Sequence, residues 1–242
     1  MERPYYEAYD DRYRVAHENG VRWFDGDPTP LVGKVIQKYG ITKETPILEV
    51  GCGEGRDALP LLSAGYRVTA TDLSEEAINY CRTLCPEHAD AFFTLDCVRG
   101  TPPGRFGFVY AVAVLHMLTD ECDRAAFYSF IASALAPNGI ALVCSMGDGK
   151  AEYSTDPALA FTEQPRRVRG ITLNVAATTC RIVSMTTFEA ELSRTPLSVL
   201  KTGFTEIPGN FDRMLYAVVG SGPRGRARNA DGDAAARPNG KT

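Results

Sequence analysis

Residues 47–57 read Ile-Leu-Glu-Val-Gly-Cys-Gly-Glu-Gly-Arg-Asp, and the rest of the chain is organised around this stretch. Apolar residues lead into an acid, then into glycines at alternate positions, then into a helix-compatible segment. Glycine is needed where the backbone adopts a positive φ or lies directly against a ligand. A helix that begins there offers free N–H groups and the positive end of its dipole. The stretch predicts a strand, a tight ligand-binding turn and a helix.

The spacing of the glycines separates this turn from a dinucleotide site. A dinucleotide fingerprint places its third glycine three residues after the second. Here Gly51, Gly53 and Gly55 are followed by Arg56 where that third glycine should stand. The carboxylate of Glu49 would also repel a pyrophosphate, whereas it suits a ligand with an amine. A nicotinamide oxidoreductase is therefore disfavoured, although it remains an alternative.

Strands and helices alternate after the glycine turn. Strands are predicted at residues 66–71, 91–95, 106–112 and 140–145, and helices at about 56–64, 74–84 and 120–135. The strand at 106–112 is apolar throughout, as a strand buried on both faces should be. This alternation predicts a parallel sheet with helices on both faces. Ligands of such sheets bind beyond the carboxyl ends of the strands.

Acidic residues stand at three successive strand ends. Glu49, Asp72 and Asp96 end the first, second and third predicted strands. Asp72 follows Gly51 by 21 residues, the spacing of an acid that binds ribose hydroxyls. Each acid taken alone is better explained as a helix N-cap. Three of them beside one glycine turn favour a ligand site.

Five segments together resemble the successive motifs of class I S-adenosylmethionine-dependent methyltransferases. They are residues 49–55 (Glu-Val-Gly-Cys-Gly-Glu-Gly), 71–74 (Thr-Asp-Leu-Ser), 95–97 (Leu-Asp-Cys), 114–116 (Val-Leu-His) and 135–139 (Leu-Ala-Pro-Asn-Gly). The resemblance covers residues 45–145 in order and spacing. One departure is Gly107, where the family usually has an acid of structural rather than ligand-binding role.

The resemblance implies a Rossmann-like α/β fold and S-adenosyl-L-methionine as cofactor. The seven-stranded sheet would have the order 3-2-1-4-5-7-6, with the last strand antiparallel. Glu49 would lie near the amino group of the cofactor, Asp72 would bind its ribose and Asp96 its adenine amine. The full set of cofactor-site residues predicted in this way is Tyr9, Tyr13, Trp23, Glu49, Gly51, Cys52, Gly53, Asp57, Asp72, Leu73, Asp96, Cys97, Val112 and Ala113.

Residues 1–45 are predicted to form an N-terminal helical cap. Tyr6, Tyr9 and Tyr13 share one helical face, which suits either packing on the body or a lid that reaches the ligand. Trp23, in a turn-rich loop, is either a pocket wall or a core residue. This region is similar to small-molecule methyltransferases of the tellurite-resistance and thiopurine type, a likeness that suggests a small substrate.

Residues 146–184 interrupt the alternation and are predicted to be a lid inserted after strand five. The segments 170–175 and 180–184 are expected to pair as a β-hairpin. Asp148 is the best substrate-side carboxylate, with a plain turn aspartate as the alternative. A helix capped by Thr186 or Thr187 then runs to about residue 201, and strands at 204–207 and 214–219 end the fold.

His116 is the only histidine near the predicted site and is a candidate general base. The alternative is a histidine at a helix start, satisfied by the backbone. Cys81, Cys85 and His88 have a metal-like spacing but lack a second ligand pair, so no metal is expected.

Composition bounds the remaining possibilities. The 242 residues, 44% hydrophobic, are enough for a single domain over 1–219, whereas the Gly-, Ala-, Pro- and Arg-rich segment 220–242 is expected to be a disordered tail. An odd number of cysteines, seven, and the absence of a long apolar run favour a cytoplasmic protein. The net charge of −4 gives no reason to expect nucleic acid or membrane as partner.

The sequence thus predicts a cytoplasmic S-adenosylmethionine-dependent methyltransferase that moves a methyl group to a small-molecule nucleophile. A non-catalytic protein that binds the cofactor or a partner on the same fold is one alternative. A macromolecule methyltransferase is another, mildly disfavoured by the lack of a basic face. The methyl acceptor and the oligomeric state stay open.

Overall fold

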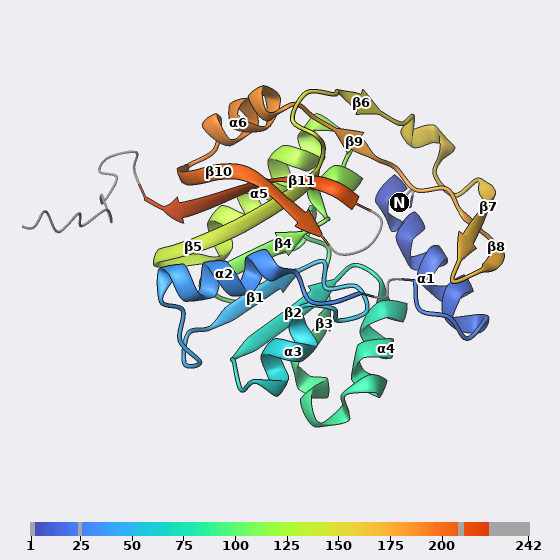
Figure 1. The fold of residues 1–242 in the computed structure, drawn as a ribbon, viewed down its shortest axis with the longest axis horizontal. Helices are drawn as coiled ribbons and strands as arrows, with labels where there is room; N and C mark the ends of the chain where they lie inside the picture. Colours follow the sequence, from blue (N-terminus) through green and yellow to red (C-terminus); the bar gives the residue numbers. More distant parts are fainter. Residues whose placement is uncertain (1–2, 24–25, 208–210, 223–242) are drawn as a thin grey trace, which may run out of the picture.

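The computed structural model describes residues 3–23, 26–207 and 211–222, and a mixed seven-stranded sheet forms their centre (Figure 1). Its strands, in spatial order, are β10 (Leu197–Ile207), β11 (Phe211–Ser221), β5 (Leu135–Met146), β4 (Phe106–Val112), β1 (Ile47–Val50), β2 (Val68–Asp72) and β3 (Phe92–Thr94). Strands β1 to β5 are parallel, and β11 is antiparallel to both β5 and β10. The predicted order 3-2-1-4-5-7-6 is confirmed.

Helices cover both faces of the sheet, each over its own apolar cluster. One face carries α2 (Pro30–Tyr39), α3 (Ala58–Ser63) and α4 (Glu75–Leu84), and the other carries α5 (Glu121–Ala134) and α6 (Met185–Ser193). Side-chain caps begin these helices where the sequence offers them. The Ser74 hydroxyl accepts from the backbone of Ala77, and the Asp120 carboxylate accepts from two N–H groups of the first turn of α5.

The N-terminal segment lies across the carboxyl ends of the parallel strands. A short 3-10 turn, η1 (Tyr5–Glu7), leads into α1 (Ala8–Glu18). The Tyr5 hydroxyl accepts from the backbone N–H groups of Thr119 and Asp120, at 3.0 and 3.2 Å, and so ties the segment to the start of α5. In Figure 1, α1 lies next to the hairpin of β7 (Glu163–Val168) and β8 (Ile171–Ala176) at one end of the molecule.

The pairing predicted within the insertion is wrong. Residues 170–175 are extended, but they pair with β7 on their N-terminal side rather than with residues 180–184. Arg169 and Gly170, both at positive φ, close this hairpin in two residues, a turn that favours tight strand pairing. Strand β9 (Arg181–Ile182) pairs instead with β6 (Tyr153–Ser154), and η4 (Pro157–Leu159) lies between the two pairs.

Some predicted boundaries also move. The helix expected to run to residue 201 ends at Ser193, and its cap is Ser184 rather than Thr186 or Thr187. Residues from Leu197 onward form β10, and the side chain of Leu197 packs in the core. The predicted strand at 91–95 is shortened to β3 by the 3-10 helix η2 (Pro86–Ala91). Residues 220 and 221 belong to β11, and the predicted tail from 223 to 242 lies outside the described residues.

Candidate active site

A cavity of about 700 Å³ lies at the carboxyl ends of the parallel strands, beneath α1 and the β7–β8 hairpin. Its size is within the range of small-molecule sites, roughly 300–1,000 Å³. The floor comes from the turns that follow β1, β2, β3 and β4. Of the predicted cofactor-site residues, all except Glu49 and Asp57 line this cavity: Tyr9, Tyr13, Trp23, Gly51, Cys52, Gly53, Asp72, Leu73, Asp96, Cys97, Val112 and Ala113.

The glycine turn is shaped by close packing from above. Gly51 and Gly53 have φ values of 75° and 52°, a region that favours glycine. A Cβ on Gly51 would collide with the side chain of Val114, and one on Gly53 would lie 2.6 Å from the Tyr13 hydroxyl. The turn is therefore a cradle in which backbone faces the cavity. Ala113, with φ of 62°, adds a strained residue at the end of β4, a feature that clusters at functional sites.

Asp72 is held rigidly on the floor of the cavity. One carboxylate oxygen accepts from the backbone N–H of Gly53 at 2.7 Å, and the other from that of Ser74 at 2.9 Å. The lone pairs that remain on both oxygens leave it able to accept from a diol. Burial raises the pKa of Asp72 above its usual range, an effect that these backbone donors oppose.

Asp96 lies on the other side of the floor, next to η1. One of its oxygens accepts from the backbone of Val98 and Arg99, and the Tyr6 hydroxyl donates to the other at 3.2 Å. The neighbouring Cys97 thiol is shielded from solvent, and burial raises its pKa to about 12. It therefore stays protonated at physiological pH and is no nucleophile.

Helix α1 is clamped to the glycine turn through Glu54. The ring of His17 bridges two carboxylates, at 2.9 Å from Glu54 and 2.7 Å from Glu76, and stacks on Tyr80. The backbone N–H of Trp23 donates to the same Glu54 at 2.7 Å. This network fixes the tyrosine face of α1 over the cavity, so the lid and the packing interpretations of that face hold together.

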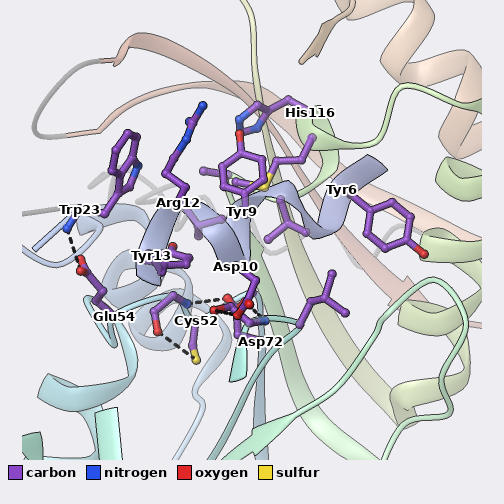
Figure 2. Close-up of a pocket in the computed structure, with 18 of the residues that line it drawn as sticks. Tyr6, Tyr9, Asp10, Arg12, Tyr13, Trp23, Cys52, Glu54, Asp72 and His116 are labelled. Carbon is purple, nitrogen blue, oxygen red and sulfur yellow. Dashed lines mark hydrogen bonds between the residues drawn. The ribbon is translucent and has the colours of Figure 1, made fainter. Parts of the chain in front are cut away.

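The roof of the cavity is built from α1 and the hairpin. Arg12 is buried, 7% exposed, and donates to the carbonyl of Ala176 at 3.0 Å. Its guanidinium lies over the rings of Tyr9 and Trp23, 5.2 and 4.6 Å from their centroids. Figure 2 shows the Arg12 side chain extending away from Cys52 and Asp72. Arginines of the hairpin, including Arg166 and Arg167, line the same part of the cavity.

Glu49 and Asp57 lie behind the glycine turn rather than on the cavity surface. Glu49 is buried and accepts from the Tyr110 hydroxyl at 2.9 Å; burial, reinforced by the nearby charge of Asp57, raises its pKa to about 8. Asp57 accepts from the backbone N–H and the hydroxyl of Thr29 and from Arg56. Both acids brace the turn from below.

The two candidate catalytic residues differ in position. His116, in η3 (Leu115–Met117), lines the cavity, but burial and the nearby Arg124 lower its pKa to about 3. Asp148 is exposed outside the cavity, and one of its oxygens accepts from the backbone N–H groups of Lys150 and Ala151 at 2.8 Å. That pattern is an ordinary turn.

Sequence reasoning missed several cavity residues that long-range packing brings in. Asp10 accepts from the Ser74 hydroxyl at 2.7 Å, and Arg12 reaches β8. Both lie on α1, where the helical period marks only the aromatic face. Arg166 belongs to β7, a strand that the sequence analysis did not predict. Only a charge excess in residues 166–169 signals it in the sequence.

The residues present fit an adenosyl amino acid. The cavity is lined by the carboxylates of Asp10 on α1 and of Asp72 and Asp96 on the floor, a set of hydrogen-bond acceptors suited to hydroxyls, amines and positive charge and unsuited to a pyrophosphate. The glycine cradle allows a ligand to approach the backbone. In the described part of the chain, no group of three or more histidine, cysteine or acidic side chains is arranged to hold a metal ion.

The segment that forms the floor of the cavity is similar to known methyltransferases. Residues 47–139 match the family described as "Methyltransferase domain". A 2-heptyl-1-hydroxyquinolin-4(1H)-one methyltransferase of Mycobacteroides abscessus is 28% identical over 127 residues. The match covers 50% of this chain and 55% of that protein, so the chain spans about half the length of this curated relative.

Solved methyltransferase structures share the fold. The 1,6-didemethyltoxoflavin-N1-methyltransferase of Burkholderia thailandensis, with 1,6-didemethyltoxoflavin and S-adenosylhomocysteine bound, has a TM-score of 0.67 at 17% identity, over 91% of each chain. The glycopeptide N-methyltransferase MtfA, in complex with S-adenosylhomocysteine, has a TM-score of 0.61 at 21% identity, over 82% of this chain and 92% of that one. No helix within the described residues is long and apolar enough to span a bilayer.

Proposed function

We propose that this chain, which carries a class I S-adenosylmethionine-dependent methyltransferase domain, transfers a methyl group to a small molecule bound in the cavity beneath α1 and the hairpin. The observation that carries the proposal is the floor itself. Asp72 ends β2 with its carboxylate directed to the glycine turn, inside a cavity that a separate roof covers.

The residues of the floor would hold the donor. Asp72 offers lone pairs to the ribose, Asp96 lies where the resemblance places the adenine amine, and Leu73 packs beside them. The backbone of Gly51 and Gly53 leaves room for the amino acid part. Glu49, behind the turn, supplies a carboxylate of raised pKa whose charged form a ligand ammonium favours.

The chemistry asks for positioning rather than for a reactive side chain. The donor supplies a methyl group already activated by its sulfonium. The protein contributes alignment, exclusion of water and a fitting electrostatic environment. The clamp of His17 on Glu54 holds α1 over the cavity, and Tyr13 closes over Gly53. His116, neutral because of its low pKa, is a wall rather than a base in this mechanism.

The acceptor is a small, flat molecule with an oxygen, nitrogen or sulfur nucleophile. Tyr9 and Trp23 give the roof aromatic surfaces against which a planar ring can pack. The curated relative is named for a hydroxyquinolinone, and one structural neighbour has 1,6-didemethyltoxoflavin bound, which supports this size class. The cytoplasm, where the free cysteines would stay reduced, is the proposed site of action.

Ligand binding to the full-length protein tests the donor assignment. We expect S-adenosylmethionine and S-adenosylhomocysteine to raise the melting temperature and NAD to leave it unchanged. The Asp72→Ala variant should lose about 10- to 100-fold in affinity for S-adenosylhomocysteine, the cost of bonds to a charged acceptor. Exposed Asp148→Ala serves as the control and should bind like wild type. Stabilisation by NAD alone would overturn the proposal.

A screen for S-adenosylhomocysteine formation tests the transfer itself. It would offer planar phenols, hydroxyquinolones, heteroaromatic amines and thiols to the enzyme with excess donor. Turnover of at least one class supports an enzyme. Tight binding of the donor with no turnover on any class would favour a non-catalytic binding protein.

A further inference from the structure

The two halves of the cavity carry opposite charge. The floor holds the carboxylates of Asp72 and Asp96, with Asp10 of α1 hydrogen-bonded to it through Ser74, whereas the roof presents Arg12, Arg166 and Arg167. None of these three arginines forms an ion pair with a carboxylate within the described residues. The chain as a whole has a net charge of −4, so this cluster runs against the overall charge.

Arg12 is the unusual member of the cluster. It is 7% exposed, and among the described residues its guanidinium donates only to the carbonyl of Ala176. Its Nε atom is buried and has no hydrogen-bond partner in the described part of the chain. Burial lowers the pKa of Arg12, and the positive charge of Arg166 lowers it further. A buried guanidinium in the same cavity as a second cation is costly, and an anion bound by both would offset that cost.

The surroundings of Arg12 separate this anion from the donor. Its side chain reaches the carbonyl of Ala176 in β8, and Figure 2 shows it extending away from Cys52 and Asp72. The rings of Tyr9 and Trp23 flank the guanidinium, leaving apolar surface beside the charge. This combination suits an aromatic ring that carries a negatively charged group.

We propose that the roof binds an anionic group of the methyl acceptor, a carboxylate or a comparable oxyanion, between Arg12 and Arg166 with its ring against Tyr9 and Trp23. The inference rests on the proposed function, because it names the substrate class of the same cavity. An arginine fork matches a carboxylate in geometry, and such charge-assisted hydrogen bonds are among the strong ones in proteins.

Calorimetry with a matched pair of probes tests the charge preference. The probes are 1-naphthoate and the neutral 1-naphthamide, titrated into the full-length protein saturated with S-adenosylhomocysteine. We expect the carboxylate to bind at least about tenfold more tightly than the amide. Equal affinity for the two probes, or no binding of 1-naphthoate, overturns the proposal.

Variants locate the preference. Arg12→Gln should lower the affinity for 1-naphthoate to that for 1-naphthamide, and Arg12→Lys should restore part of the difference between the two affinities. Arg14→Gln, the same change on the exposed side of α1, should leave both affinities unchanged. If Arg12→Gln does not fold, the exposed Arg166→Gln still tests the site, with an expected loss of about threefold for the carboxylate alone. Wild-type affinity for 1-naphthoate in the folded variants overturns the proposal.

A second titration distinguishes the source of the anion. If Arg12 instead holds the carboxylate of the donor, Arg12→Gln will lower the affinity for S-adenosylhomocysteine. It will leave the affinity for 5′-methylthioadenosine, which lacks the amino acid part, unchanged. That result overturns the acceptor assignment. If S-adenosylhomocysteine does not bind wild type at all, the proposed function fails. The naphthoate titration without it then still decides whether the roof is an anion site.

Discussion

Gly53 shows how one residue couples the cap to the ligand turn. A residue other than glycine would be strained at the φ of 52° that position 53 adopts. A Cβ added there would lie 2.6 Å from the Tyr13 hydroxyl. We predict that Gly53→Ala lowers the free energy of unfolding by about 1–3 kcal/mol, from backbone strain and from the clash. Removing the hydroxyl in Tyr13→Phe should relieve the clash but not the strain.

A double-mutant cycle in urea measures this coupling. The double variant should lose less unfolding free energy than the two single variants lose together, by about 0.5 kcal/mol or more. Strict additivity would show that Tyr13 does not pack on Gly53. Gly20→Ala is the control for strain alone, because Gly20 has φ of 69° and a Cβ added there would meet nothing within 4 Å.

His116 offers a prediction about protonation. Burial and Arg124 lower its pKa to about 3, so its imidazole should stay neutral from pH 8 down to about pH 4. Nuclear magnetic resonance of the imidazole nitrogens can follow the three histidines separately, with His116→Gln assigning the signal. A signal from His116 that titrates near pH 6.5 would contradict this and would restore it as a candidate base.

At the scale of the elements, the ion pair of Arg124 and Glu191 joins helices α5 and α6 beside the cavity. Arg124 of α5, 2% exposed, makes a two-pronged contact with Glu191 of α6 at 2.8 and 2.7 Å. It also donates to the carbonyls of Leu115 and Leu118, which flank the loop that carries His116. One guanidinium therefore fixes two helices and a cavity-lining turn relative to one another.

Removing this arginine should be costly. We predict that Arg124→Met lowers the free energy of unfolding by about 3 kcal/mol, because the largely buried carboxylate of Glu191 loses its charged partner and keeps only the hydrogen bond from the Tyr128 hydroxyl. The double variant with Glu191→Met should lose less, because no uncompensated charge remains. Urea unfolding measures both, with exposed Arg194→Met as a control expected within about 0.5 kcal/mol of wild type. A double variant worse than the single one would contradict the pairing argument.

For the whole molecule, Glu49 links stability to pH. Its pKa is raised to about 8 by burial, so the ligand-free folded state retains a proton that the unfolded chain releases above about pH 4.5. Folded stability is therefore lost as pH rises from about 4.5 to about 8. Glu49→Gln removes this contribution, and its stability relative to wild type should rise across that window, by up to about 1.4 kcal/mol per pH unit.

Denaturant unfolding at several pH values between 4 and 9 measures that difference. A difference independent of pH would show that Glu49 ionises normally in the fold. Saturation with S-adenosylhomocysteine should flatten the dependence, because a ligand ammonium near Glu49 favours its charged form.

The floor and the sheet were predictable because their signals are local. Gly51, Gly53 and Asp72 follow from spacing within 26 residues, and the strand at 106–112 from its continuous apolar run. The roof was not predictable in the same way. Arg12 becomes a cavity residue only through its contact with Ala176, 164 residues away. The hairpin was mispaired because Arg169 at positive φ gives no turn signal in the sequence.

The match to the methyltransferase domain, residues 47–139, includes no part of the roof. Tyr9, Arg12 and Trp23 precede that segment and Arg166 follows it, whereas every glycine of the cradle and every acid that closes a strand lies inside it. In the proposed function, the floor that would hold the donor and the hairpin that would contact the acceptor are therefore encoded by separate stretches of the gene. Chimaeras that exchange residues 163–176 between related enzymes offer a direct route to new acceptors while α1 and the glycine turn stay unchanged.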